Sequence, residues 1–182
     1  MLLQSPICYK TIASPWGSMT VAASAQGLCG AWFEGQQHFP NFSNWVYEPN
    51  NSHLLNAEVL LKSYFQGQWP QGLSARDRLQ SIPLDLSAGT DFQQAVWQAL
   101  LSIPMGQTCS YGQVASAIGR PSAVRAVGTA IGRNPVSILV PCHRVLGAQG
   151  QMTGYAGGIW RKQALLQLEN ALGTSASASH HL

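Results

Sequence analysis

The spacing of apolar residues changes from strand-like to helical near residue 90, and this change constrains the fold more than any other feature. Before it, three short segments have the alternation and flanking turn residues of β-strands: Ile7–Ala13, Ser18–Ser24 and Leu28–Glu34. A helical apolar stripe covers His53–Gln66, followed by an irregular connection with a short strand near Ile82–Leu84. The sequence therefore predicts an α/β (α+β) fold, with a mixed N-terminal domain and connection over residues 1–88 and a helical domain over residues 89–173.

Helix-start signals divide the C-terminal half into several helices. Thr90–Gln93 and Ser110–Gln113 both have the spacing of a capping box. We expect the second of these helices to run through Ile118, and a third, capped by Ser122, to reach about Gly132. Two helices joined by a short glycine-containing turn make a helix-turn-helix candidate, although ordinary helical cores contain such pairs too.

The third predicted helix carries small residues opposite its apolar stripe. Arg125, Gly128, Thr129 and Gly132 fall at positions i, i+3, i+4 and i+7, so they share one face. Glycine inside a helix costs about 1 kcal/mol relative to alanine. Either another molecule approaches the backbone on this face, with Arg125 as the only long side chain, or a second helix packs closely there. The spacing favours neither interpretation.

The charge is sparse and unevenly distributed. Charged residues make up only 9% of the 182 residues, against about 25% in an average soluble protein, which excludes a charge-rich disordered chain. Residues 1–88 hold four basic and five acidic side chains, whereas residues 89–182 hold six basic and two acidic ones. A basic C-terminal half is compatible with a polyanionic partner such as nucleic acid but does not establish one.

Nothing in the sequence indicates a membrane span or a secretory signal. The longest uncharged stretches are interrupted by Pro, Gly, Ser and Gln, and the N-terminus lacks a basic region followed by an apolar one. The four cysteines have no CxxC spacing, and a chain of this length does not need a disulfide framework. We expect a cytoplasmic protein without membrane contact, ending in a disordered Ser- and Ala-rich tail over residues 174–182.

Cys142 and His143 stand together after an apolar stretch, Ile138–Val140, that predicts a short strand. The thiolate is the nucleophilic form of cysteine, so a histidine network that lowers the pKa of the thiol would favour covalent chemistry. Neighbouring residues of a strand point to opposite faces, so contact between the two side chains requires a turn or a bridging water. A buried structural cysteine is the alternative interpretation.

A histidine base is commonly oriented by a carboxylate, and the C-terminal half offers only Asp91 and Glu169. The place of Asp91 is explained by the first turn of a helix, where an anion is stabilised. Glu169 lies in a predicted terminal helix, Ile159–Leu172, on the face of Lys162. It either orients the histidine from a partly buried position or is a solvated carboxylate at the helix end.

The segment Pro141-Cys142-His143-Arg144-Val145, preceded by Asn134-Pro135-Val136, is similar to the signature of the O6-alkylguanine-DNA alkyltransferases, the methylated-DNA–protein-cysteine methyltransferases. The resemblance covers about residues 8–172. It extends through Ser14-Pro15-Trp16-Gly17, Trp32-Phe33-Glu34-Gly35, Ser110-Tyr111-Gly112-Gln113, Arg120-Pro121, Arg125-Ala126-Val127-Gly128, Met152-Thr153-Gly154-Tyr155-Ala156-Gly157-Gly158 and Arg161-Lys162. It implies a ribonuclease-H-like N-terminal domain and a C-terminal domain with a helix-turn-helix.

The resemblance also implies catalytic roles. Cys142 matches the alkyl acceptor, linked through water to His143 and from there to Glu169. Asn134 matches the residue that braces the active-site loop, and Tyr111 matches the tyrosine that contacts the flipped guanine and helps it to leave as a neutral base. Because the product is a thioether without a carbonyl for water to attack, we expect irreversible, stoichiometric repair in place of turnover. O6-alkylguanine is the expected lesion, and O4-alkylthymine is a second candidate.

Further positions correspond to recognition of the lesion. Arg125 matches the arginine that fills the gap left in the duplex, on a helix that family members place in the minor groove. Backbone groups of Cys142, Val145 and Ala156 correspond to those that recognise the guanine edge and O6. The other positions implied in binding DNA or the base are Gly128, Thr129, Tyr155 and Lys162. We therefore expect a monomer whose partner is double-stranded DNA bearing alkylated guanine.

Some positions depart from the better-known members. Ala156 replaces a serine found in several of them, and Asn170 stands after Glu169 where glycine is frequent. The zinc site of some animal members is not reproduced at all its positions by Cys8, Cys29, His38 and His53. We therefore predict no required metal and no cofactor.

Three other functions compete with alkyl transfer. A damage-sensing protein of the same fold would bind the lesion without transfer, but such proteins lack the acceptor cysteine that is present here. A thiol hydrolase using Cys142 and His143 would show turnover on an ester or amide. A regulatory helix-turn-helix protein would need base-specific side chains, whereas the predicted DNA face is mostly glycine and threonine.

Overall fold

The structure, a computed structural model, describes residues 6–80 and 82–172. Its N-terminal part is a four-stranded sheet in the order β3-β2-β1-β4. The antiparallel strands β1 (Cys8–Ile12), β2 (Met19–Ser24) and β3 (Gly27–Phe33) confirm the three predicted strands, and a short β4 (Val46–Tyr47) runs parallel to β1. The turn between β2 and β3 holds Gly27 at φ +148°, a conformation that glycine adopts without steric cost.

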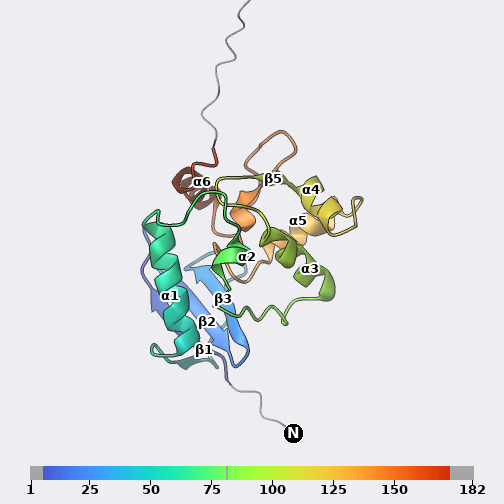
Figure 1. Ribbon diagram of the computed structural model, residues 1–182. Coiled ribbons are helices and arrows are strands. Elements are labelled where there is room, and N and C mark those ends of the chain that lie inside the picture. The colour runs from blue at the N-terminus through green and yellow to red at the C-terminus, as the bar shows by residue number, and fades with distance from the viewer. Residues whose placement is uncertain (1–5, 81, 173–182) are drawn as a thin grey trace, which may run out of the picture.

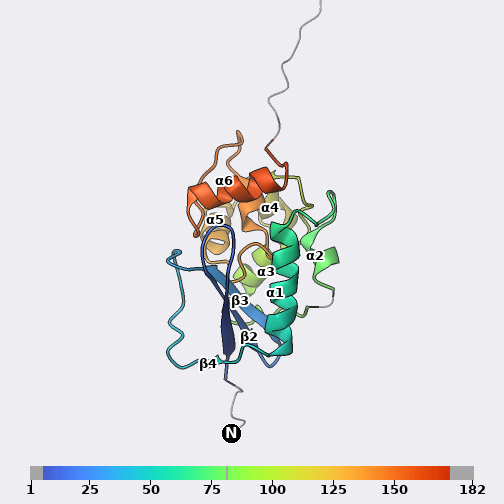
Figure 2. The same cartoon turned by 90° about the vertical axis from the view of Figure 1, so that its left-hand side faces the viewer.

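One long helix, α1 (Ser52–Phe65), lies against one face of this sheet (Figure 1; Figure 2). Its N-cap is Asn51, whose side chain accepts a hydrogen bond from the backbone N–H of His53. The buried positions recur at helical spacing: Leu54, Ala57, Leu61 and Tyr64. The helix predicted over residues 53–66 is confirmed.

The C-terminal part is helical, as predicted, and occupies the other side of the molecule in Figure 1. Two short strands, β5 (Cys109–Ser110) and β6 (Val145–Leu146), pair in parallel within it. A small helix, α2 (Ala75–Arg78), precedes this part. The remaining elements of the part are α3 (Asp91–Leu100), α4 (Tyr111–Ala117), α5 (Val124–Gly132), the 3₁₀ turn η1 (Cys142–Arg144) and α6 (Ile159–Leu168). α4 and α5 pack on each other and on α3, which gives the helix-turn-helix pair a helical base.

Two of the predicted helix caps are confirmed and one is wrong. Thr90 and Ser110 each form a reciprocal capping box with the glutamine three residues on. Ser122 is not a cap: α5 begins one residue later than expected, with Ala123 as an N-cap that makes no side-chain bond. The physical reason is a turn closed by the N–H of Ala123 on the carbonyl of Arg120, which leaves Ser122 one position too early.

The strand predicted over Ile138–Val140 is also wrong. Ile138 has φ +72°, and the N–H of Leu139 bonds the carbonyl of Ser137, so the chain makes a tight buried turn. The extended residues come just before it, where Ala31 of β3 exchanges hydrogen bonds with Pro135 and Ser137 at 2.9 and 2.8 Å. The continuous apolar run over residues 138–140 therefore indicates that the segment is buried, but it does not indicate that the segment is a strand. The strand near residues 82–84 is reduced to one bridge between Leu28 and Leu84.

Both parts of the chain share one apolar core, which runs from Ile12 on β1 to Leu165 on α6. The terminal helix ends at Leu168, four residues earlier than predicted, and Asn170 follows it at φ +52°. Asparagine is the residue that most often replaces glycine in this left-handed helix-ending position. The predicted tail over residues 174–182 lies outside the described residues. In the part that is described, we find no helix with both the length and the apolar character needed to cross a membrane.

Candidate active site

Cys142 opens the 3₁₀ turn η1, immediately after the buried loop of residues 134–141. In a strand the side chains of Cys142 and His143 would point to opposite faces. The 3₁₀ turn supplies the bend that contact between them would require. In consequence Cys142, His143 and Arg144 are all buried, with only 5% of the cysteine exposed. Consecutive buried residues of these types in a chain so poor in charge single out this turn as the chemical centre of the molecule.

Asn134 holds both the loop and the sulfur. Its Nδ2 donates to the carbonyl of Val140 at 2.8 Å and to Cys142 Sγ at 3.0 Å, while its Oδ1 accepts from the N–H of Val136. A single buried amide thereby fixes the start of the loop, its end and the reactive atom. This geometry matches the bracing role that the resemblance implies for Asn134.

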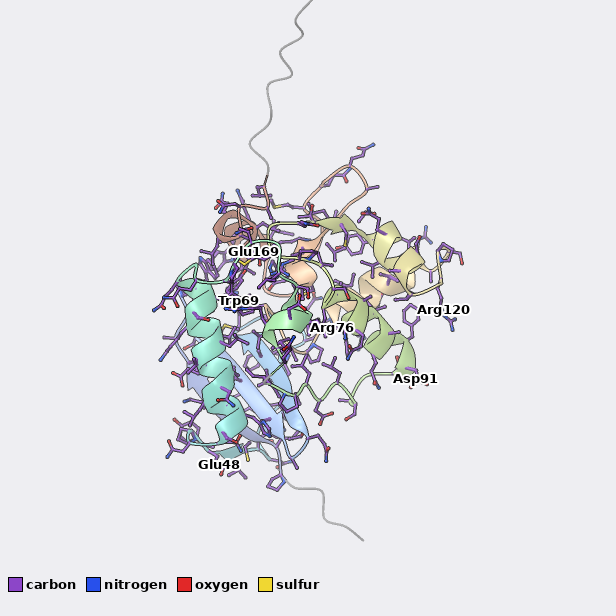
Figure 3. All side chains as sticks on the ribbon, in the orientation of Figure 1. Glu48, Trp69, Arg76, Asp91, Arg120 and Glu169 are labelled. Carbon is purple, nitrogen blue, oxygen red and sulfur yellow. The ribbon has the colours of Figure 1, made fainter. Side chains whose placement is uncertain are left out.

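His143 faces a fully buried carboxylate. Its Nε2 lies 2.7 Å from Glu169 Oε1, at the end of α6. Arg144 binds the same carboxylate from the next position of the chain, Nε donating to Oε2 at 2.8 Å and Nη2 to Oε1 at 2.9 Å. Of the two interpretations of Glu169, the structure therefore supports the buried, orienting one. Figure 3 shows Glu169 close to the end of α1 and beneath α6.

A third donor reaches this carboxylate from the N-terminal sheet domain. Tyr64, on α1, donates its hydroxyl to Glu169 Oε1 at 2.7 Å. Sequence reasoning missed Tyr64 because it falls on the apolar stripe of its helix, where nothing distinguishes it from a core aromatic. It also gave no role to Arg144, although a cation next to the candidate base was a signal that could have been used.

The buried charges determine the protonation of His143. Although burial acts to raise the pKa of Glu169, the charge and hydrogen bonds of its partners hold that pKa well below its usual range, and Arg144 keeps the group anionic. Burial lowers the pKa of His143, and the neighbouring carboxylate only partly opposes this. A neutral imidazole facing a carboxylate carries its proton on Nε2, so Nδ1 keeps a lone pair. Within the described residues, Nδ1 is buried and has no hydrogen-bond partner.

The cysteine itself is not poised as a thiolate in the free protein. Burial raises the pKa of Cys142, and the hydrogen bond from Asn134 and the positive charge of Lys162 act against this without reversing it. The lowered thiol pKa that would favour covalent chemistry is therefore not present in the DNA-free structure, since an apolar setting penalises the anion. The resting pair is a neutral thiol beside a neutral imidazole that can accept a proton.

The predicted DNA face of α5 is largely open among the described residues, with Tyr111 of α4 at its edge. Arg125 and Thr129 are exposed. A methyl group added at Gly132 would meet no described atom within 4 Å, and one added at Gly128 would only touch the ring of Tyr111 at 3.8 Å. Close packing of a second helix, the alternative reason for these glycines, is not what the structure shows.

Lys162 requires a correction. It was placed among the residues that bind DNA or the base, but its side chain is fully buried and its ammonium donates to the carbonyls of Val145 at 2.6 Å and Thr153 at 2.9 Å. Burial lowers its pKa to about 8. Lys162 therefore holds together the two backbone segments that flank the site. Thr153 in turn contacts Tyr111, whose hydroxyl lies 3.3 Å from its Oγ1.

The remaining predicted binding residues line the same region. Val145 is buried, so only its backbone is placed for the role implied for it. Tyr155 is partly buried, and its hydroxyl is enclosed without a partner among the described residues. The carbonyl of Ala156 accepts a hydrogen bond from the N–H of Gln37, from the N-terminal domain, at 2.9 Å.

No group of three or more His, Cys, Asp or Glu side chains that could hold a metal ion occurs within residues 6–80 and 82–172.

Comparison with known proteins identifies the family. Residues 7–74 match the ribonuclease-like domain, and residues 91–171 the DNA-binding domain, of 6-O-methylguanine DNA methyltransferase. The chain belongs to the 6-O-methylguanine DNA methyltransferase family. A methylated-DNA–protein-cysteine methyltransferase of Salmonella typhimurium is 52% identical over 171 residues, covering 90% of this chain and 95% of the relative. One of Mycobacterium tuberculosis is 47% identical over 165 residues, covering 91% and 93%.

Solved structures of this methyltransferase family agree with the fold. A crystal structure of the Mycobacterium tuberculosis protein in complex with DNA has a TM-score of 0.77 and 45% sequence identity, covering 90% of this chain and 93% of that one. A Pyrococcus kodakaraensis member, at 22% identity and a TM-score of 0.60, shows the same fold. The family membership and fold class inferred from the motifs are thereby confirmed.

Proposed function

We propose that this chain repairs O6-alkylguanine in duplex DNA by moving the alkyl group onto its own Cys142. The observation that carries the proposal is a buried thiol, held by Asn134, at the start of a turn whose next residue contacts the buried carboxylate of Glu169. The names of the relatives, which transfer methyl groups from DNA to a protein cysteine, support the same reaction.

The proposed reaction is an in-line displacement. The thiol proton passes through a bridging water to Nδ1 of His143, which has the free lone pair, while Glu169 stabilises the imidazolium that forms. The sulfur then forms a bond to the alkyl carbon as the bond from that carbon to guanine O6 breaks. The guanine leaves with a proton delivered near Tyr111 or from water. Since the thiol is neutral in the free protein, we propose that it loses its proton only during the reaction, after the lesion has bound.

The exposed small-residue face of α5 supports a place in the minor groove of DNA. Gly128 and Gly132 leave room for the sugar–phosphate backbone to approach, and Arg125 is the long side chain we propose to fill the gap left by the flipped base. Extrusion costs a few kcal/mol, and less where alkylation has weakened base pairing. The site residues assigned to binding act on this face or on the loop held by Lys162.

We propose further that the protein acts as a monomer in the cytoplasm. All four cysteines are free in the structure, as in a reducing compartment.

The decisive experiment is mass spectrometry of the protein after incubation with duplex DNA containing O6-methylguanine. We expect the peptide with Cys142 to gain the mass of one CH2 group, and one lesion to be repaired per protein molecule. Cys142→Ala should still bind the lesion but transfer nothing, while Cys109→Ala, which changes a half-buried cysteine on β5, serves as the matched control. Repair of several lesions per molecule, or a label on another residue, would contradict the proposal. Lesion binding without transfer by the unaltered chain would indicate a damage sensor, and turnover on an ester would indicate a hydrolase.

A further inference from the structure

Tyr64 reaches the proposed proton relay from the other domain. It is fully buried near the end of α1, and its hydroxyl donates to Glu169 Oε1 at 2.7 Å. This is the oxygen that His143 Nε2 also approaches at 2.7 Å, and the tyrosine hydroxyl lies 3.5 Å from that nitrogen. The N-terminal domain thus contributes a hydrogen bond at the residue on which the base depends.

All the titratable groups around His143 can be named. Arg144 follows it on η1, and Glu169 and Lys162 face it from α6. Cys142 precedes it, and Tyr64 faces it from α1, with the ring centroids 6.4 Å apart. Tyr155, from the loop before α6, is near enough to Tyr64 to influence its ionisation. Two of these groups share Glu169 Oε1 with the imidazole: Arg144, through Nη2 at 2.9 Å, and Tyr64, the neutral donor, at 2.7 Å.

A purely structural role for Tyr64 is the alternative. Its ring packs edge-on against Trp69 at 5.0 Å and Phe65 at 5.8 Å, and a buried hydroxyl needs an acceptor somewhere. Phenylalanine, however, would fill the same space without introducing a polar atom. The Tyr64 hydroxyl donates its hydrogen bond to Glu169, the carboxylate that faces the candidate base, and not to a backbone carbonyl.

We propose that Tyr64 is a positioning residue of the alkyl-transfer reaction, which holds the Glu169 carboxylate toward His143 and limits the proton affinity of the imidazole. This inference rests on the function proposed above. A donated hydrogen bond withdraws charge from Oε1, so the carboxylate stabilises an imidazolium less strongly. The imidazole then stays neutral at rest, with Nδ1 free to take the proton of the Cys142 thiol.

The test is Tyr64→Phe, which removes one oxygen and keeps the ring. We expect His143 to titrate at a higher pH in the variant, by about one pH unit, because Oε1 then serves fewer donors. A protonated imidazole cannot accept the thiol proton. The single-turnover rate of methyl transfer should therefore fall by about three- to tenfold at pH 6 and recover toward the unaltered rate at pH 8.

The measurements are an NMR titration of the His143 ring in the DNA-free protein and the rate of adduct formation as a function of pH. Tyr47→Phe is the matched control, since Tyr47 is 61% exposed on β4 and the change is the same. An unchanged titration and an unchanged pH profile in Tyr64→Phe, with only lower stability, would overturn the proposal. The NMR titration uses DNA-free protein, so it tests the effect of Tyr64 on His143 independently of alkyl transfer. If neither the unaltered protein nor the variant forms an adduct, the proposed function is refuted, but the titration result still stands.

Two further variants keep the proposal open to refutation if Tyr64→Phe folds poorly. A fluorinated tyrosine at position 64 is a stronger donor of the same shape, and we expect it to move the His143 titration in the opposite direction, to lower pH. A double-mutant cycle of Tyr64→Phe with Glu169→Gln should be non-additive in rate, because both act through one carboxylate. Additive effects, or a shift to higher pH with the fluorinated residue, would overturn the inference.

Discussion

The two halves of the molecule differ in what they bury. In the N-terminal half the buried polar side chains are Lys10, Thr20 and Gln36, each retaining 5–9% of its exposure. In the C-terminal half they are Asn134, Ser137, His143, Arg144, Lys162 and Glu169, retaining 0–4%. Burying a charge is expensive unless it is paired. The difference indicates that the first half is mainly an apolar scaffold, while the second places its ionisable groups where they affect the cysteine.

The scaffold nevertheless takes part in the site at its boundary. Tyr64 contacts Glu169, Gln36 Oε1 accepts a hydrogen bond from Ser137 at 3.3 Å, and the N–H of Gln37 bonds the carbonyl of Ala156 at 2.9 Å. These contacts reach the relay, the cysteine loop and the segment before α6. The first half therefore fixes the geometry of the second while containing none of the residues that we propose to react.

The largest effect on stability should come from Arg144→Met, which leaves a buried carboxylate without its cation. We expect the free energy of unfolding to fall by about 3–5 kcal/mol, measured by urea denaturation. Arg125→Ala changes an exposed arginine of the same half and should stay within about 0.5 kcal/mol of the unaltered protein. Equal losses in the two variants would contradict the contrast between buried and exposed charge.

A smaller loss, confined to the scaffold, should follow from Leu54→Ala on α1. Deleting this fully buried side chain should lower the free energy of unfolding by about 3 kcal/mol. The transfer rate per folded molecule and its pH profile should not change, because Leu54 lies near the start of α1, ten residues before Tyr64. Val59→Ala, on the same helix and 69% exposed, is the control. A changed pH profile would show that the apolar core of the scaffold, and not only its boundary contacts, affects the chemistry.

Acid should weaken the C-terminal half through Glu169. Its pKa is lower in the folded protein than the ordinary value of 4.5, so the folded state binds fewer protons than the unfolded state in that range. Its contribution to stability is therefore present above about pH 4.5 and is lost as the pH falls toward the folded pKa. The lowered pKa values of Glu58, Asp77 and Asp85 add to the same slope. Denaturation curves from pH 6 to 3 should show a shallower slope for Glu169→Gln, and an identical slope would refute this assignment.

The smallest expected effect is that of Gly132→Ala, which should raise stability and weaken DNA binding. Gly132→Ala adds a methyl group that meets no described atom, so the helix should gain about 0.5–1 kcal/mol. The same methyl group should weaken binding to duplex DNA, measured by fluorescence anisotropy at fixed salt, because it occupies the face we propose to lie in the groove. Gln163→Ala, on the exposed side of α6, is the control and should leave DNA binding unchanged. Unaltered binding by Gly132→Ala would place the DNA elsewhere.

Local signals in the sequence predicted much of the fold. The strands near residues 8–33, helix α1 and the capping boxes at Thr90 and Ser110 depend on neighbouring residues, and the structure confirms them. Ile138–Val140 was predicted wrongly, because buried turns and buried strands have the same apolar composition. Ser122 was predicted wrongly because one further residue of turn moved the helix start.

The candidate site was predictable only in part. Cys142, His143 and Asn134 are close in the sequence, and a family signature marks them. The burial of Lys162 and the contact of Tyr64 with Glu169 are not visible locally, since partners 105 residues apart meet only after the sheet and the helices have packed. The role in binding DNA or the base that the resemblance implies for Lys162 therefore did not indicate that its side chain would be buried.

By itself the sequence determined most of the helices and strands, the family, and the cysteine and histidine that we propose to react, because propensity, capping and motif spacing act over a few residues. Only the tertiary structure decided which groups lose contact with water. That loss raises the pKa of the Cys142 thiol, whereas Glu169 stays ionised only because packing also brings Arg144 and His143 to its carboxylate. The same packing directs Tyr64 of one domain to Glu169 of the other. Proton affinity depends on burial and on the charges nearby, and both are properties of the packed chain.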